Sequence, residues 1–232
     1  KLSIIMPAYN EEQTITKITE KCLSQKINGI DSIEILMIDD CSKDQTLTVM
    51  RQLEKKYPQI KVLSHEQNQG KGAAIRTALR HISGDICLIQ DADLEYDPAD
   101  YPYLLEPIVQ GRADCVYGSR FVGTQAKRVL FFWHSVGNKF LTLLSNMLTN
   151  INLTDMETCY KAFRSDILKS ITIESDDFRF EPEVTIKIAK KRCRIFEVGI
   201  SYSGRTYAEG KKINWVDGIK AIWAMFRFSL WA

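Results

Sequence analysis

Short apolar runs alternate with amphipathic stretches through the first half of the chain. The apolar runs are of strand length and rich in β-branched residues, and they occupy positions 2–6, 32–39, 60–65, 85–90 and 113–119. Between them, apolar residues recur at helical spacing over about 14–25, 45–57, 70–81 and 101–110. Buried strands that alternate with helices are typical of a mostly parallel sheet with helices on both faces. The pattern therefore predicts an α/β fold.

The second half of the chain has longer apolar stretches and a basic loop. Residues 128–148 are rich in apolar side chains, a helix is expected near 184–191, and a strand is expected at 194–202. The basic loop at 203–213 leads into a final helix that begins near Trp215. One face of this helix carries large apolar residues at helical spacing, namely Trp215, Ile219, Ile222, Trp223, Phe226 and Leu230.

Composition excludes several classes of protein. The sequence has 232 residues, of which 45% are hydrophobic, enough for one large core. Its formal net charge of +2 gives no reason to expect a nucleic-acid partner. None of the six cysteines belongs to a CxxC pair and the three histidines are dispersed, which argues against a zinc site and a disulfide framework. We expect one large domain in a reducing compartment.

Polar clusters follow the first four predicted strands, at the point where each strand ends. They are PAYNEE at 7–12, DDCSKD at 39–44, NQGKG at 68–72 and DADLEYD at 91–97. The carboxyl ends of parallel strands meet at one edge of a sheet, where the ligands of such folds bind. We therefore expect one site built from all four clusters.

The fourth cluster carries acidic residues at alternate positions. Alternate residues beyond a strand can point the same way, so Asp91 and Asp93 can reach one divalent cation. Mg²⁺ and Mn²⁺ prefer carboxylate, water and phosphate oxygens, so two carboxylates and a diphosphate suit them. The alternative is that both aspartates form turns and caps. Asp97 with Pro98 predicts a helix start, and Glu95 is balanced between a metal or substrate contact and solvent.

The other clusters suit a nucleotide, although each also has a purely structural interpretation. Glu11 fits the floor of a nucleoside pocket, or an acidic residue that stabilises a helix N-terminus. Asp39 and Asp40 can accept hydrogen bonds from a ribose or a base, or form a turn before the next helix. Lys71 lies at a glycine-rich helix start that suits an anionic nucleotide. The spacing is not that of a P-loop, which argues against an ATPase.

Taken together in this order, the clusters resemble those of the family-2 inverting glycosyltransferases with the A-type, Rossmann-like nucleotide-sugar fold. The resemblance is strongest to the polyprenyl-phosphate glycosyltransferases and covers nearly the whole chain. It rests on the segments PAYNEE, DDCSKD, NQGKGAA, DADLE, GSRF, DMETCYKAF, FRFEPE and GRTYAEGKKI. It implies a catalytic domain over 1–212, with a nucleotide-sugar half at about 1–122 and an acceptor half at about 123–212. Residues 213–232 would form an amphipathic, membrane-proximal helix.

The resemblance also implies which residues bind the nucleotide sugar. The nucleoside would be held by residues of the first two clusters, Pro7, Tyr9, Glu11, Asp39 and Asp40. Lys71 would lie near the nucleotide. Asp91 and Asp93 would hold the diphosphate and a Mg²⁺ or Mn²⁺ ion, with help from Glu95 in binding the metal.

On the acceptor side, the resemblance implies a set of cations around the phosphates. Arg120 would face the two phosphate groups, and Asp155 would lie beside the sugar and the acceptor. Arg205, together with Lys211 or Lys212, would come from a loop that closes over the diphosphate.

The sequence departs from the pattern of some relatives near the acceptor phosphate. Some mannose synthases have an arginine four residues before the serine that corresponds to Ser135, where this sequence has Phe131. The nearest cations are Arg128 and His134, so Arg120, Arg128 and Ser135 are the predicted contacts of the acceptor phosphate. The segment DMETCYKAF lacks the glycine that precedes the aromatic residue in many relatives, so the identity of the sugar is not transferred.

The predicted reaction is transfer of a hexose from a UDP- or GDP-linked sugar to a polyprenyl phosphate such as dolichyl or undecaprenyl phosphate. This acceptor is largely ionised near neutral pH and needs little help from a base. Catalysis then depends on positioning and on electrostatic stabilisation of the departing diphosphate. Asp155 would orient the sugar or the acceptor, and one displacement would invert the anomeric centre.

Three alternatives stay open. A transferase that acts on a sugar hydroxyl in polysaccharide or glycolipid synthesis needs an acidic base, for which Asp155 and Glu183 are candidates. A nucleotide-sugar-binding protein without activity is disfavoured by the intact DADLE cluster, Arg120 and Arg205. A metal-dependent nucleotidyltransferase shares the same chemistry at the strand ends but is disfavoured by the long apolar segments.

A lipid acceptor requires contact with a membrane surface. The stretch 128–148 and the final helix carry aromatic residues beside cations, which suits the headgroup boundary. The alternative is that they pack on the sheet or form a dimer face, so a homo-oligomer stays open. The sequence has no signal-peptide pattern and no run of the about 18 apolar residues that a spanning helix needs. We expect the cytoplasmic face of a membrane, reached peripherally or through helices beyond this sequence.

Overall fold

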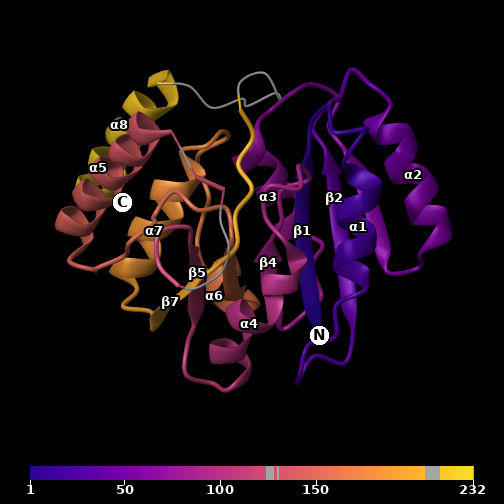
Figure 1. The fold of residues 1–232 in the computed structure, drawn as a ribbon, viewed down its shortest axis with the longest axis horizontal. Helices are drawn as coiled ribbons and strands as arrows, with labels where there is room; N and C mark the ends of the chain where they lie inside the picture. Colours follow the sequence, from indigo (N-terminus) through magenta and orange to yellow (C-terminus); the bar gives the residue numbers. More distant parts are fainter. Residues whose placement is uncertain (124–127, 130, 207–214, 232) are drawn as a thin grey trace.

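The structure is a computed structural model that describes residues 1–123, 128–129, 131–206 and 215–231. These residues form an α/β fold around one central sheet (Figure 1). The strands of the described part are β1 (Leu2–Ala8), β2 (Ile33–Asp39), β3 (Ile60–Ser64), β4 (Ile86–Ile89), β5 (Cys115–Ser119), β6 (Lys161–Arg164) and β7 (Ile195–Gly199). Their order across the sheet is β3-β2-β1-β4-β6-β5-β7.

The sheet is mostly parallel, as the sequence predicts. The exception is β6, which pairs antiparallel with both β4 and β5. Because β6 lies between β4 and β5, the two predicted halves of the catalytic domain share one sheet. This strand was not predicted from the sequence, since its four residues are too few to show a readable alternation of apolar and polar positions.

Helices flank the sheet on both sides. They are α1 (Ile15–Leu23), α2 (Thr46–Lys56), α3 (Lys71–Leu79), α4 (Tyr101–Val109), α5 (Phe132–Thr149), α6 (Ser165–Lys169), α7 (Phe180–Lys190) and α8 (Trp215–Trp231), with a short 3₁₀ helix η1 (Pro98–Asp100) before α4. The first four agree with the predicted helices to within two residues at either end. α7 begins at Phe180, earlier than expected, because Pro182 is tolerated in a first helical turn.

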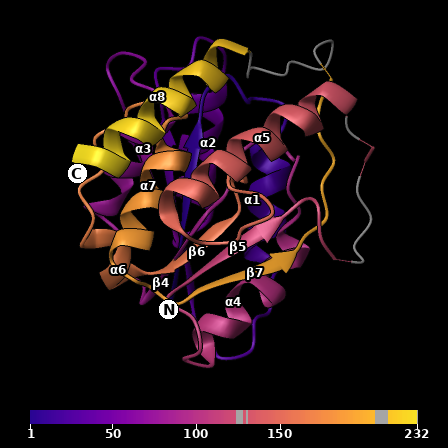
Figure 2. The same ribbon diagram turned by 90° about the vertical axis from the view of Figure 1, so that its left-hand side faces the viewer.

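Helices α5, α7 and α8 pack against one another and form a layer beside the sheet (Figure 2). α8 buries Ala224, Met225 and Phe228. The apolar stripe predicted for this helix points the other way, with Trp215 77% and Trp223 53% exposed. The alternative in which this stripe packs on the sheet is therefore wrong, since the opposite face of α8 makes the internal contacts.

The exposed apolar surface continues from α8 onto α5. On α5 it comprises Phe132, Trp133, Val136, Phe140, Leu143 and Met147. Within the described ranges, no helix combines the length and the apolar character needed to cross a membrane. We call this exposed surface of α5 and α8 the apolar face.

Candidate active site

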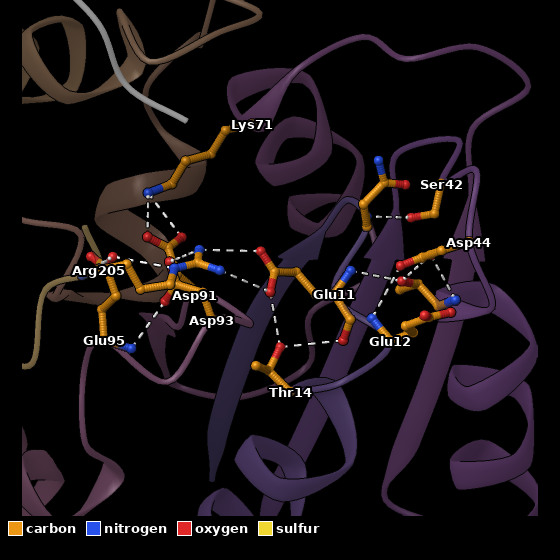
Figure 3. A network of polar contacts seen from close by, with 12 residues as sticks. Glu11, Glu12, Thr14, Ser42, Asp44, Lys71, Asp91, Asp93, Glu95 and Arg205 are labelled. Carbon is orange, nitrogen blue, oxygen red and sulfur yellow. Dashed lines mark hydrogen bonds and ion pairs between the residues drawn. The ribbon is translucent and has the colours of Figure 1, made fainter. Parts of the chain in front are cut away.

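Three acidic side chains surround the guanidinium of Arg205 (Figure 3). Its Nη2 lies 2.7 Å from Asp93 Oδ2 and 3.3 Å from Glu11 Oε1. The backbone N–H of Arg205 donates to Glu95 Oε1 at 2.8 Å. Glu11 follows β1, whereas Asp93 and Glu95 follow β4, and these strands are neighbours. The first and fourth polar clusters therefore meet at one edge of the sheet, as the sequence predicts.

A second cation, Lys71 at the start of α3, pairs with Asp91 (Figure 3). Lys71 Nζ lies 3.0 Å from Asp91 Oδ1 and 3.1 Å from Glu181 Oε1. Glu181 is also paired with the fully buried Lys161. Burial opposes the charged form of Lys71, but the charges of Asp91 and Glu181 outweigh it and hold the pKa of Lys71 well above its usual range. Lys71 and Arg205 together make the row of carboxylates tolerable.

The carboxylates nevertheless keep an excess of negative charge. Burial, followed by the charges of Asp91 and Glu95, raises the pKa of Asp93 to about 7, although Arg205 opposes the shift. An added cation would relieve this repulsion. In the part of the chain that the structure describes, no three acidic, histidine or cysteine side chains form a ready-made metal site. Mg²⁺ and Mn²⁺ often bind through one or two carboxylates plus phosphates, so Asp91 and Asp93 fit such an ion together with a bound diphosphate.

A cavity of about 850 Å³ begins at these side chains and extends between α5 and α8. Its charged end is lined by Glu11, Lys71, Asp91, Asp93, Glu95 and Arg205. Its other end is lined mainly by apolar side chains of the two helices, Trp133, Phe140, Leu141, Trp215, Ile219 and Ile222, with the polar side chains of His134, Asn138 and Asp217 among them. The cavity therefore joins a strongly polar environment to an apolar one.

The predicted nucleoside contacts are only partly on the cavity. Pro7, Tyr9, Glu11 and Asp40 line it. Asp39 does not belong to the described residues of the lining, and its Oδ2 accepts the N–H of Ser42 at 3.2 Å. The role of these residues in holding a nucleoside stays a prediction.

Asp40 fixes the loop that presents Lys71. Its Oδ2 accepts the N–H of Gly70 at 2.7 Å, and its Oδ1 lies 2.7 Å from His65 Nδ1. Gly70 has a φ of +96°, and a Cβ at this position would lie 2.5 Å from the carbonyl oxygen of Asp176, so a larger residue would be strained. The Gly70 amide is therefore used within the protein.

Arg120 and Asp155 form a buried ion pair. Nε and Nη2 of Arg120 each lie 2.6 Å from a carboxylate oxygen of Asp155. Asp155 is fully buried, whereas Arg120 lines the cavity and lies over the ring of Tyr202. Asp155 was expected beside the sugar and the acceptor, but Arg120 occupies both of its oxygens in this structure. Its carboxylate therefore holds the Arg120 side chain in place, and its place beside the sugar and the acceptor stays a prediction.

Other predicted residues are not brought to the cavity. Neither Arg128 nor Ser135 is among the described residues that line it. Glu183 is fully buried, accepts the N–H of Ser175 and pairs with Lys187, which leaves it unsuited to the role of a base. Two further predicted residues lie outside the described part of the chain, Lys211 and Lys212.

Two residues of the cavity wall were missed by sequence reasoning. The hydroxyl of Tyr202 donates to Glu95 Oε2 at 2.6 Å and so helps to fix this carboxylate. Glu157 also lines the cavity. Tyr202 could have been suspected from its place beside the basic loop, and Glu157 from its place in the segment DMETCYKAF.

The family model and the relatives that match this chain all point to the same family of glycosyltransferases. Residues 3–172 match the family model described as Glycosyl transferase family 2. Over 98% of its length, the chain is 27% identical to a UDP-N-acetylglucosamine–dolichyl-phosphate N-acetylglucosaminyltransferase from Methanococcus voltae, of which it covers 95%. Over 91% of its length, it is 27% identical to a dolichol-phosphate mannosyltransferase from Pyrococcus furiosus, of which it covers only 59%. Over 87% of its length, it is 29% identical to a dolichyl-phosphate β-glucosyltransferase from Trichomonas vaginalis, of which it covers 65%.

Solved structures support the fold. A glucosyl-3-phosphoglycerate synthase from Mycobacterium tuberculosis, crystallised with Mn²⁺, UDP and glucosyl-3-phosphoglycerate, superposes with a TM-score of 0.74. The comparison covers 99% of this chain and 80% of the synthase, at 21% sequence identity. A likeness at this level of identity shows a common fold.

Proposed function

Because the chain belongs to glycosyl transferase family 2, we propose that it transfers a hexose from a nucleoside-diphosphate sugar to a polyprenyl phosphate at a membrane surface. The observation that carries this proposal is the cavity, which joins the charged sheet edge to the apolar wall between α5 and α8. A charged donor and a lipid acceptor require these two environments side by side. The names of the three relatives, all transferases of dolichyl or dolichol phosphate, support the same class of acceptor.

The charged end suits the diphosphate of the donor. Asp91 and Asp93 would hold a Mg²⁺ or Mn²⁺ ion, with Glu95 beside them, and such an ion supplies positive charge that stabilises the departing diphosphate. Lys71 and Arg205 already lie at these carboxylates. Both cations are therefore within a short side-chain movement of phosphate oxygens, to which they can donate charge-assisted hydrogen bonds.

The acceptor side suits an anion that needs no base. A polyprenyl phosphate carries its own nucleophilic oxygen in ionised form, so the protein has to position it and not to deprotonate it. Arg120 lines the cavity with its charge held by Asp155, which suits the binding of a phosphate. Attack from the face of the sugar opposite the diphosphate, in a single displacement, inverts the anomeric centre.

The apolar face suits the lipid. Large side chains such as Phe132, Trp133 and Trp223 are more than half exposed there. Arg227 lies 5.4 Å from the ring of Trp223, which places a cation among the aromatic residues. Aromatic residues and cations together are typical of helices that lie in the headgroup region. The lipid tail would then enter the cavity between α5 and α8 from the membrane.

The proposal is tested by transfer of a radiolabelled sugar to a short polyprenyl phosphate in detergent, with Mn²⁺ and with UDP-glucose, UDP-N-acetylglucosamine or GDP-mannose as donor. The matched control acceptor is the polyprenol that lacks the phosphate. We expect labelled lipid from the phosphate alone. Transfer to a sugar hydroxyl in its place would favour polysaccharide or glycolipid synthesis, and transfer to neither class of acceptor would refute the proposal.

A further inference from the structure

Glu157 lies at a rigid part of the cavity wall, in the segment between α5 and β6. The backbone on either side of it is pinned by side chains from elsewhere in the fold. The N–H of Met156 donates to Thr142 Oγ1 at 3.2 Å, and the N–H of Cys159 donates to the hydroxyl of Tyr96 at 3.1 Å. A side chain presented from such a support keeps a defined position.

One oxygen of the Glu157 carboxyl has no hydrogen-bond partner among the described residues. Its Oε1 is buried and accepts no hydrogen bond from any residue that the structure describes. Leaving a buried acceptor unpaired is unfavourable, so such a group in a native fold calls for an explanation. Two other carboxyls have a buried oxygen without a hydrogen bond among the described residues, Asp39 and Glu181. Asp39 is not among the described residues that line the cavity, and Glu181 Oε1 lies 3.1 Å from the ammonium group of Lys71. Among the described carboxyls of the cavity wall, Glu157 is therefore the one whose missing donor a bound ligand can supply.

Charges from both ends of the site act on Glu157. Burial and then the charge of Glu181 raise its pKa to about 7, Asp155 adds to the shift, and Lys161 and Arg120 oppose it. Glu181 belongs to the group that pairs with Lys71 at the diphosphate end, and Arg120 belongs to the acceptor end. The next step rests on the proposed function. A sugar that is transferred from the diphosphate to the acceptor occupies the space between these two ends.

We propose that Glu157 accepts hydrogen bonds from hydroxyl groups of the transferred sugar and so determines which sugar the protein uses. Above its raised pKa of about 7, the Glu157 carboxyl is ionised and has only acceptor sites, and sugar hydroxyls are donors that match them. A phosphate at the same place would be repelled, which separates the role of Glu157 from that of the neighbouring cations. A site built to bind a hydroxyl also discriminates strongly against analogues that lack it.

The test compares the affinity of a nucleotide sugar with that of its nucleoside diphosphate, both measured calorimetrically with Mn²⁺ at pH 8, where Glu157 is ionised. The pairs are UDP-glucose and UDP-N-acetylglucosamine with UDP, and GDP-mannose with GDP. In the Glu157→Gln variant, we expect unchanged affinity for the diphosphate. Affinity for the preferred nucleotide sugar should fall about ten- to a hundredfold, as for a lost hydrogen bond to a charged group.

Two further comparisons separate a sugar contact from a structural effect. Among monodeoxy analogues of the preferred donor, the wild type should bind at least one about tenfold more weakly, and Glu157→Gln should be insensitive to that same deletion. Glu157→Asp should regain part of the lost affinity. The control is Glu197→Gln, because Glu197 accepts the N–H groups of Thr154 and Asp155 and supports the same segment away from the sugar. This control should lower Tm and weaken sugar and diphosphate binding by equal factors.

These measurements need no lipid, so they stand whether or not a polyprenyl phosphate is the acceptor. Equal losses of diphosphate and nucleotide-sugar affinity in Glu157→Gln would overturn the inference. An unchanged ratio of nucleotide-sugar affinity to diphosphate affinity in this variant would overturn it too. A wild-type chain that binds every nucleotide sugar no more tightly than its diphosphate would also overturn it. Loss of transfer to a sugar hydroxyl with intact sugar binding would instead make Glu157 a base, contrary to the proposal.

Discussion

Replacing Asp155 by asparagine should destabilise the protein strongly, although the two side chains have nearly the same volume. Arg120 makes two hydrogen bonds of 2.6 Å to the Asp155 carboxylate, and Asp155 is fully buried. Hydrogen bonds to charged groups contribute about 1.5–3 kcal/mol each. Removing one partner of a buried ion pair costs about 3–5 kcal/mol, because the remaining charge is left uncompensated. For a chain of this size, each kcal/mol lowers Tm by about 2–4 °C, so we expect a fall of about 6–20 °C.

The chain offers a matched control in a second pair with the same chemistry. Asp114 accepts from Nε of Arg194 at 3.1 Å and from its Nη2 at 2.8 Å, but the Arg194 side chain is 52% exposed. Exposed ion pairs contribute about 0–1 kcal/mol, so on the same scale Asp114→Asn should lower Tm by no more than about 4 °C. Thermal unfolding followed by circular dichroism measures both variants under identical conditions. Equal shifts in the two variants would refute the idea that Asp155 serves to hold the Arg120 charge in a buried position.

Three other predictions follow from the same geometry. Glu157→Gln should be more stable than the wild type at pH 8 and no more stable below about pH 5, as measured by denaturant unfolding. In the folded wild type the pKa of Glu157 is raised from its ordinary value of 4.5 to about 7, so the free energy of unfolding of the wild type falls as the pH rises between these two values. A difference in stability that does not depend on pH would contradict this prediction. Asp93→Asn, or EDTA added to the wild type, should reduce kcat for transfer at least about a hundredfold, and undiminished transfer in EDTA would exclude a metal. Phe132→Ser and Trp223→Ser should each weaken binding to anionic lipid vesicles about tenfold in a flotation assay. The control Tyr103→Ser, on the exposed surface of α4, should leave vesicle binding unchanged. Equal effects of all three substitutions would argue against the apolar face as the membrane contact.

The strands and the edge of the sheet that forms the site could be predicted because both signals are local. Each of β1 to β4 is a short apolar run with a polar cluster at its carboxyl end. Parallel strands then bring these ends together whatever the details of packing. The antiparallel insertion of β6 was not predictable, since it depends on a pairing between segments more than 70 residues apart in β4 and β6.

The partners of the site residues could not be predicted, because they come from distant parts of the chain. Asp91 meets Lys71 only because α3 and the end of β4 are adjacent in the fold. The sequence indicates that both Arg120 and Asp155 matter, but not that they neutralise each other in a buried pair. The role proposed for Glu157 depends on a buried oxygen that accepts no hydrogen bond among the described residues, and hydrogen bonds cannot be read from a sequence.

The central claim is that the chain forms a bond between a sugar and a lipid phosphate with inversion. The most direct test is ¹H and ³¹P NMR of the purified lipid product made from the preferred donor. We predict an anomeric proton coupled to a single phosphorus, with the anomeric configuration opposite to that of the donor. An anomeric carbon bonded to a carbohydrate oxygen with no phosphorus coupling would contradict the account, and a retained configuration would contradict the single displacement.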